Sequence, residues 1–193
     1  MRTPEEIKEI IIARAKADSR IRAVLLTGSR ANQKIPPDDL QDFDIIYVVH
    51  HINDFIADHT WTSVFGEKLI WQLPDEMELS GSVEKQKKYH SFHYLMLFND
   101  GNRIDLTLFP VEEIKMHFIP DSLTLIWLDK DGLFKEIKPA TDNDYHIKEP
   151  THKYFLDVCN EFWWVSTYIA KGLARKEILY AKLNMEGPVR KCF

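Results

Sequence analysis

The sequence predicts an α+β fold: a mixed sheet of about five strands flanked by helices, followed by the start of an α-helical domain. Short apolar runs rich in β-forming residues alternate with turn residues between positions 23 and 128. A polar stretch with proline follows, and residues 151–171 then repeat apolar side chains at the spacing of one long amphipathic helix. We therefore expect two domains, residues 1–145 and residues 146–193.

The chain opens with a helix-start pattern. Thr3 is suited to the N-cap, Pro4 to the first helical position, and Glu6 completes a capping box. Strands are expected at residues 23–27, 43–49, 69–71, 92–98, 103–109 and 123–128. Further helices are expected at residues 151–171 and 174–183, and another is expected to begin at residues 110–113. Residues 50–56 are expected to form a brief turn into a helix, and residues 80–90 a mobile polar connection.

The composition is that of an ordinary globular protein, with 45% hydrophobic and 28% charged residues among 193. No apolar run is long enough to span a membrane and the N-terminus lacks an apolar signal core, so we expect a cytoplasmic protein without a membrane partner. The formal charge of −5 argues against a nucleic-acid partner and suits a cationic small molecule. Cys159 and Cys192 are too few for a disulfide framework or a zinc site, and no pattern indicates an oligomeric state.

The pair Gly28-Ser29 stops the first predicted strand. Glycine lets the backbone turn sharply and approach a ligand closely, and Ser29 offers a hydroxyl and a backbone N–H. A short helix is expected to begin at Ser29, and its free N–H groups would face a phosphate. Arg30 either adds positive charge there or is exposed or ion-paired.

Acidic residues on two later strands are the next candidates for a functional site. Asp42 and Asp44 would project from one face of a strand, while Phe43 turns the other way. Two carboxylates held this close repel each other unless a cation lies between them, and hard oxygen ligands suit Mg²⁺. Asp105 lies in the middle of a later apolar strand, on the same face as Arg103. Burying an acid there is costly unless it is paired or bound to a metal.

These residues, in this order, resemble the signature of the nucleotidyltransferase superfamily: a Gly-Ser pair ending one strand, an acid-x-acid pair on the next, and a later acid. The runs DGNRIDLT at residues 100–107 and CNEFWW at residues 159–164 are also similar to those of the aminoglycoside 6-adenylyltransferases, the streptomycin-modifying branch. The resemblance extends over nearly the whole chain. It implies a nucleotidyltransferase fold, ATP and Mg²⁺ as cofactors, and transfer of AMP to the 6-hydroxyl of streptomycin with release of pyrophosphate, which confers antibiotic resistance.

The resemblance also implies which residues act on the nucleotide. Its phosphates would be held by the turn, and the metal by the acid pair that follows. The residues implied are Gly28, Ser29 and Arg30 for the phosphates, and Asp42 and Asp44 for Mg²⁺.

The remaining candidates concern the acceptor. Asp105 would be either the general base for the attacking hydroxyl, the role that we favour, or a third metal ligand. By resemblance, Glu161 and Asp157 on the long helix would line the aminoglycoside pocket. Glu76 stands in an acidic cluster, which is either a solvated loop or a lobe that binds a polycationic sugar.

The C-terminal region departs from the family pattern. Family members continue through several more helices, whereas this chain ends soon after the second helix expected there, so we expect a truncated substrate-binding domain at residues 146–193. Two other functions fit the same motifs. One is a nucleotide-binding remnant without transferase activity, and the other is a nucleotidyltransferase that modifies a macromolecule.

Overall fold

A computed structural model describes residues 1–78, 90–117, 119–134 and 137–192. The chain forms two compact units, Met1–Tyr145 and His146–Phe193. The connection predicted at residues 80–90 lies almost wholly outside the described residues. Of the helices that are described, none is long and apolar enough to cross a membrane.

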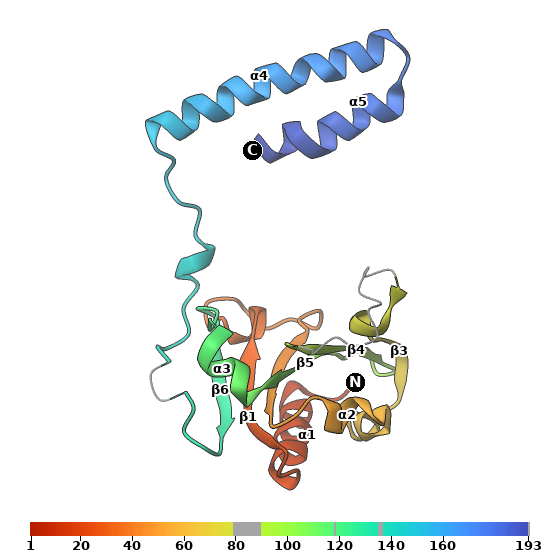
Figure 1. The fold of residues 1–193 in the computed structure, drawn as a ribbon, viewed down its shortest axis with the longest axis vertical. Helices are drawn as coiled ribbons and strands as arrows, with labels where there is room; N and C mark the ends of the chain where they lie inside the picture. The colour runs from red at the N-terminus through yellow and green to blue at the C-terminus, as the bar shows by residue number, and fades with distance from the viewer. Residues whose placement is uncertain (79–89, 118, 135–136, 193) are drawn as a thin grey trace. The chain divides into compact units, whose positions relative to one another are not determined.

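The first unit is built on a six-stranded mixed sheet with the strand order β3-β4-β5-β2-β1-β6 (Figure 1). The central pair, β2 and β5, is parallel, whereas the other neighbouring pairs are antiparallel. The α+β prediction is confirmed, and each of the six strands overlaps one of the six expected ranges. The strands are β1 (Ile21–Thr27), β2 (Phe43–Val49), β3 (Lys68–Gln72), β4 (Phe92–Phe98), β5 (Arg103–Pro110) and β6 (Leu125–Asp129).

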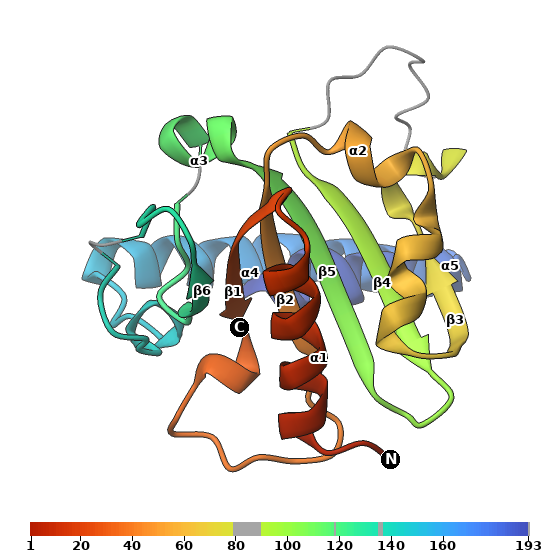
Figure 2. The same ribbon diagram turned by 90° about the horizontal axis from the view of Figure 1, so that it is seen from below.

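The helix α1 (Pro4–Ala17) begins as predicted. Thr3 Oγ1 accepts a hydrogen bond from the backbone N–H of Glu6, whose carboxylate accepts one from the N–H of Thr3. Ile7 and Ile11 are buried in the larger hydrophobic core against the sheet. The capping box therefore sets where α1 starts, and its apolar stripe fixes which face of the sheet α1 covers (Figure 2).

Alternation along β2 separates the two faces of the sheet. Phe43, Ile45 and Tyr47 are buried in the core beneath α1, where the hydroxyl of Tyr47 donates a hydrogen bond to the carbonyl of Ile11 at 2.6 Å. Burial raises the pKa of Tyr47 above its usual value. Because successive strand residues point to opposite faces, Asp44 lies on the face that α1 does not cover.

Part of that opposite face carries a second, smaller apolar cluster. Residues of β1 and β2 pack there against residues after β6 and against α3 (Val111–His117). The cluster centres on Ala23, Leu25, Val48 and Phe134. The part of this face nearest Asp44 lies outside the apolar cluster and carries polar side chains.

The second unit is a helical hairpin of α4 (His152–Ala174) and α5 (Ile178–Asn184). Thr151 caps α4 by accepting the N–H of Tyr154. Gly172 lets the two helices approach closely, because a Cβ at this position would lie 2.9 Å from Cβ of Ala181.

An ion pair ties the N-terminus to the β4–β5 turn. Arg2 Nε lies 2.6 Å from Asp100 Oδ2, and the backbone N–H of Arg2 donates to the same oxygen. The Arg2 guanidinium holds the pKa of Asp100 well below its usual range. The pair joins the start of α1 to a hairpin far along the sequence.

We predict that Asp100→Asn lowers the free energy of unfolding by about 1–2 kcal/mol at pH 7. Because the pKa of Asp100 is depressed in the folded state, its contribution is present above its unfolded pKa near 4 and is lost as the pH falls. Urea unfolding at pH 7 and pH 3 should therefore show a smaller difference from the parent chain at pH 3. Asp39→Asn, at an exposed loop acid, is the control; an Asp100→Asn effect that is equal at both pH values would contradict the prediction.

Candidate active site

Three aspartates meet at the junction of β2 and β5. The parallel register pairs Asp44 with Asp105, and the antiparallel register pairs Thr27 with Asp44. Asp42 directly precedes β2. Asp44, Asp105 and Thr27 line one cleft of about 270 Å³ on the face opposite α1, which we call the acidic cleft.

Gly28 is required by its closeness to Asp44. Its φ of +73° lies in the region that favours glycine, and a Cβ here would lie 2.2 Å from Asp44 Oδ2. The short helix expected from Ser29 is a single 3-10 turn, Ser29–Ala31. So short a turn adds little helix dipole, which leaves the hydroxyl of Ser29 and the local N–H groups as the groups available to a phosphate.

Arg30 anchors the loop that leads into β2. Its Nε lies 3.0 Å from the carbonyl oxygen of Asp42 and its Nη2 lies 2.6 Å from that of Gln41. The guanidinium also stacks on Phe43, 4.0 Å from the ring centre, and burial lowers the pKa of Arg30. In this arrangement Arg30 positions Asp42, and its contact with a phosphate stays a prediction.

Arg103 lies between two of the acids. Its Nε and Nη2 bind the two carboxylate oxygens of Asp105 at 2.8 and 2.6 Å, and its Nη1 lies 3.3 Å from Asp42 Oδ2. Asp44 forms no ion pair with any residue that the structure describes. The three aspartates therefore carry more negative charge than Arg103 neutralises.

Burial and mutual repulsion act on these acids. Burial is the main cause that raises the pKa of Asp44, and the charges of Asp105 and Asp42 raise it further. Burial also raises the pKa of Asp42, an effect that Arg103 partly opposes. A cation placed among these carboxylates would lower the pKa of both Asp42 and Asp44, because it would stabilise their charged forms.

The donor set fits a hard divalent cation such as Mg²⁺. Its oxygens are carboxylates, and Mg²⁺ takes one or two of them and fills its other positions with water and phosphate. Across residues 1–78, 90–117, 119–134 and 137–192, no three His, Cys, Asp or Glu side chains are arranged around one metal position. The carboxylates of Asp42 and Asp105 both contact the guanidinium of Arg103.

His93, which belongs to none of the sequence motifs, also lines the acidic cleft. Its Nδ1 and its backbone N–H both lie 2.8 Å from Asp75 Oδ2, so that carboxylate fixes the ring. The signal was available in the alternation of β4, where His93 shares a face with Leu95, the register partner of Asp105. Locating it required the register of the β4–β5 hairpin.

The residues predicted for the aminoglycoside fall in two places. Asp157 and Glu161 line one cavity of about 450 Å³ in the helical unit, and Asp157 pairs with Lys153 at 2.7 Å. Glu76 belongs to the sheet unit, where its carboxylate lies 3.3 Å from His59 Nε2. Their role in binding substrate stays a prediction.

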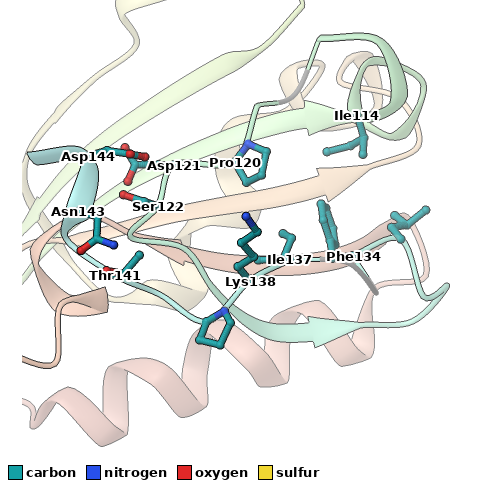
Figure 3. Close-up of a pocket in the computed structure, with 12 residues that line it drawn as sticks. Ile114, Pro120, Asp121, Ser122, Phe134, Ile137, Lys138, Thr141, Asn143 and Asp144 are labelled. Atoms are coloured by element: carbon teal, nitrogen blue, oxygen red, sulfur yellow. The ribbon is translucent and has the colours of Figure 1, made fainter.

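A larger cavity of about 580 Å³ lies elsewhere in the sheet unit (Figure 3). Ile114, Phe134 and Ile137 contribute apolar walls, and Asp121 and Asp144 are polar lining residues. The cavity shares no lining residue with the acidic cleft. Apolar walls with a few polar groups are typical of sites for small organic molecules.

We predict that Gly28→Ala weakens Mn²⁺ binding at the acidic cleft at least tenfold, because the added Cβ displaces the carboxylate of Asp44. Mn²⁺ binding is measured by electron paramagnetic resonance of the free ion. Gly101→Ala is the matched control: Gly101 also has a positive φ, +84°, but its Cβ would meet only the flexible end of Met1. Both variants should lose about 1–2 kcal/mol of stability through backbone strain. If Gly28→Ala bound Mn²⁺ as tightly as the parent chain, the expected displacement of the Asp44 carboxylate would be wrong.

The similarity of this chain to known proteins identifies its family. The family model described as streptomycin adenylyltransferase matches residues 1–193. Aminoglycoside 6-adenylyltransferase from Campylobacter jejuni is 49% identical over 99% of this chain and 65% of its own length. The protein of the same name from Bacillus subtilis strain 168 is 44% identical over 98% of this chain and 66% of its own length.

A crystal structure from the same family of proteins is also similar to this chain. The crystal structure of an aminoglycoside 6-adenyltransferase from Bacillus subtilis is similar to this chain with a TM-score of 0.53 and 37% identity, over 100% of this chain and 65% of that one. The chain thus spans just under two thirds of the length of these relatives. The likeness supports a nucleotidyltransferase fold for the sheet unit. The chain belongs to the streptomycin adenylyltransferase family.

Proposed function

We propose that this chain carries the nucleotide-transfer site of an aminoglycoside adenylyltransferase, which moves AMP from ATP to the 6-hydroxyl of streptomycin in the cytoplasm. One observation carries the proposal: Asp44 and Asp105 are register partners on the parallel strands β2 and β5, and Gly28 packs against Asp44. The names of the relatives supply the class of substrate. Modification of the drug would confer resistance to it.

Asp42 and Asp44 are the residues that we assign to Mg²⁺. Asp42 directly precedes β2 and Asp44 lies at its start, and burial, together with the charge of Asp105, raises the pKa of each. When bound, Mg²⁺ would neutralise negative charge on the phosphates of ATP and on the departing pyrophosphate. Gly28 contributes by leaving room for the carboxylate of Asp44.

The other residues act on the phosphates and on the acceptor. Ser29 and the N–H groups of its turn hold phosphate oxygens. Asp105 takes the proton of the drug hydroxyl as that oxygen bonds to the α-phosphorus and the bond to the β-phosphate oxygen breaks. Pyrophosphate leaves with the electron pair of the broken bond.

Carboxylates suit the acceptor, because streptomycin carries guanidinium groups that pair with them. Asp157 and Glu161 share a cavity in the helical unit, and we assign them to these groups. Glu76, which pairs with His59, is a further candidate from the sheet unit.

We predict transfer of label from α-³²P-ATP to streptomycin by this chain with Mg²⁺. Asp44→Asn should lower the rate at least a hundredfold, because it removes a metal-binding charge. Asp38→Asn is the matched control, since Asp38 is exposed in the preceding loop and accepts a hydrogen bond from the N–H of Leu40. Its rate should stay within twofold of the parent.

Other outcomes would contradict the proposal in distinct ways. ATP binding that needs Mg²⁺ and Asp44, without label on the drug, would indicate a nucleotide-binding protein without transferase activity. Label on a macromolecule and none on streptomycin would indicate a different acceptor.

We further predict that Asp105→Asn abolishes label transfer while Mn²⁺ affinity stays within about threefold of the parent. Asparagine keeps the size of the side chain but cannot take a proton, so this pattern is expected of a general base. Initial rates and Mn²⁺ titrations are measured on the same preparation. Loss of Mn²⁺ binding together with activity would instead identify Asp105 as a third metal ligand.

A further inference from the structure

Arg103 is the basic residue whose guanidinium binds the carboxylates of Asp42 and Asp105, whereas the nearby Arg30 binds the backbone carbonyl of Asp42. Two parallel hydrogen bonds join it to Asp105, and a longer contact joins it to Asp42. No other basic side chain in the described part of the chain forms an ion pair with either acid. Its own side chain is 44% exposed, so it can turn into solvent without opening the hydrophobic core.

A divalent cation at Asp42 and Asp44 would compete with this guanidinium. Asp42 would have to serve both cations, and two positive groups within a few ångströms of each other repel. Asp105, the register partner of Asp44, lies beside the same position. Binding of a divalent cation therefore weakens the contacts of Arg103 with these acids, and those contacts in turn weaken binding of the cation.

We propose that Arg103 is the internal counter-ion of the acid group in the metal-free protein, and that entry of a divalent cation displaces it from Asp42 and loosens its hold on Asp105. The inference rests on the metal site of the proposed function. It adds a consequence for catalysis: Arg103 occupies both carboxylate oxygens of Asp105, and displacement of the arginine leaves them open to the hydroxyl of the acceptor. Metal entry would then prepare Asp105 for its role.

The test measures Mn²⁺ affinity and metal-dependent stability, without ATP or drug. Arg103→Ala should lower the dissociation constant for Mn²⁺ about tenfold, and Mg²⁺ should compete for the same site. Its Tm should be lower than the parent's without metal and should rise more than the parent's when Mn²⁺ is added. Arg103→Gln, which keeps a polar side chain of intermediate length, should behave in the same way if Arg103→Ala does not fold.

Arg22→Ala is the matched control, because Arg22 binds both carboxylate oxygens of Asp131 through Nε and Nη2, as Arg103 binds those of Asp105. Neither residue lines the acidic cleft. Its Tm should fall, whereas its Mn²⁺ affinity and its gain in Tm on adding metal should match the parent. A purely structural role for Arg103 would give this same pattern.

Three results separate the inference from the function on which it rests. Mn²⁺ binding that Asp44→Asn abolishes, with unchanged or weaker affinity in Arg103→Ala, would overturn the inference and leave the metal site intact. No Mn²⁺ binding in either chain would overturn the inference and the metal assignment together. Tighter binding in Arg103→Ala that still depends on Asp44 would support both.

Discussion

Electrostatic repulsion among Asp42, Asp44 and Asp105 is the constraint on which the organisation of the sheet unit depends. Strand register holds Asp44 beside Asp105, so distance cannot relieve the repulsion. Burial adds to the cost, as the raised pKa of Asp44 indicates. Such a group is stable only with positive charge nearby, and Arg103 supplies part of it.

The remainder of the sheet unit makes this arrangement possible. The face beneath α1 is filled by apolar side chains, among them Ile11 and Phe43, which provide the hydrophobic stability that the acid group does not. The opposite face is only partly covered, which leaves the acids in an open cleft. Gly28 and Arg30 then fix the details: one leaves room for a carboxylate, and the other holds the backbone that carries Asp42.

Much of the fold could be predicted from local patterns. The capping box at Thr3, the alternation along β2 and the turn before Arg103 depend on residues close in sequence, and the structure confirms these local elements. The alternation of side chains along the strand also predicted that Asp105 and Arg103 lie on the same face. The contact of Arg103 with Asp42 could not be predicted, because it depends on how β2 and β5 align.

Two further features of the site, the position of His93 and the short turn after Gly28, also could not be predicted in full from local patterns. His93 joins the cleft only through the β4–β5 register, which alternation within one strand does not reveal. The short helix expected to begin at Ser29 is a single 3-10 turn, Ser29–Ala31, which is followed by a polar loop with two prolines. Long-range pairing and short turns are where local propensity has least influence.

The parallel pairing of β2 with β5 has a consequence for folding. The two strands are separated in sequence by β3 and β4, so their contact closes a long loop and carries the entropy cost of that closure. Asp44 and Asp105 become neighbours only after this step, which means that partly folded chains lack the acid pair. A ligand that requires both carboxylates would bind only the completed sheet and would shift the folding equilibrium toward it.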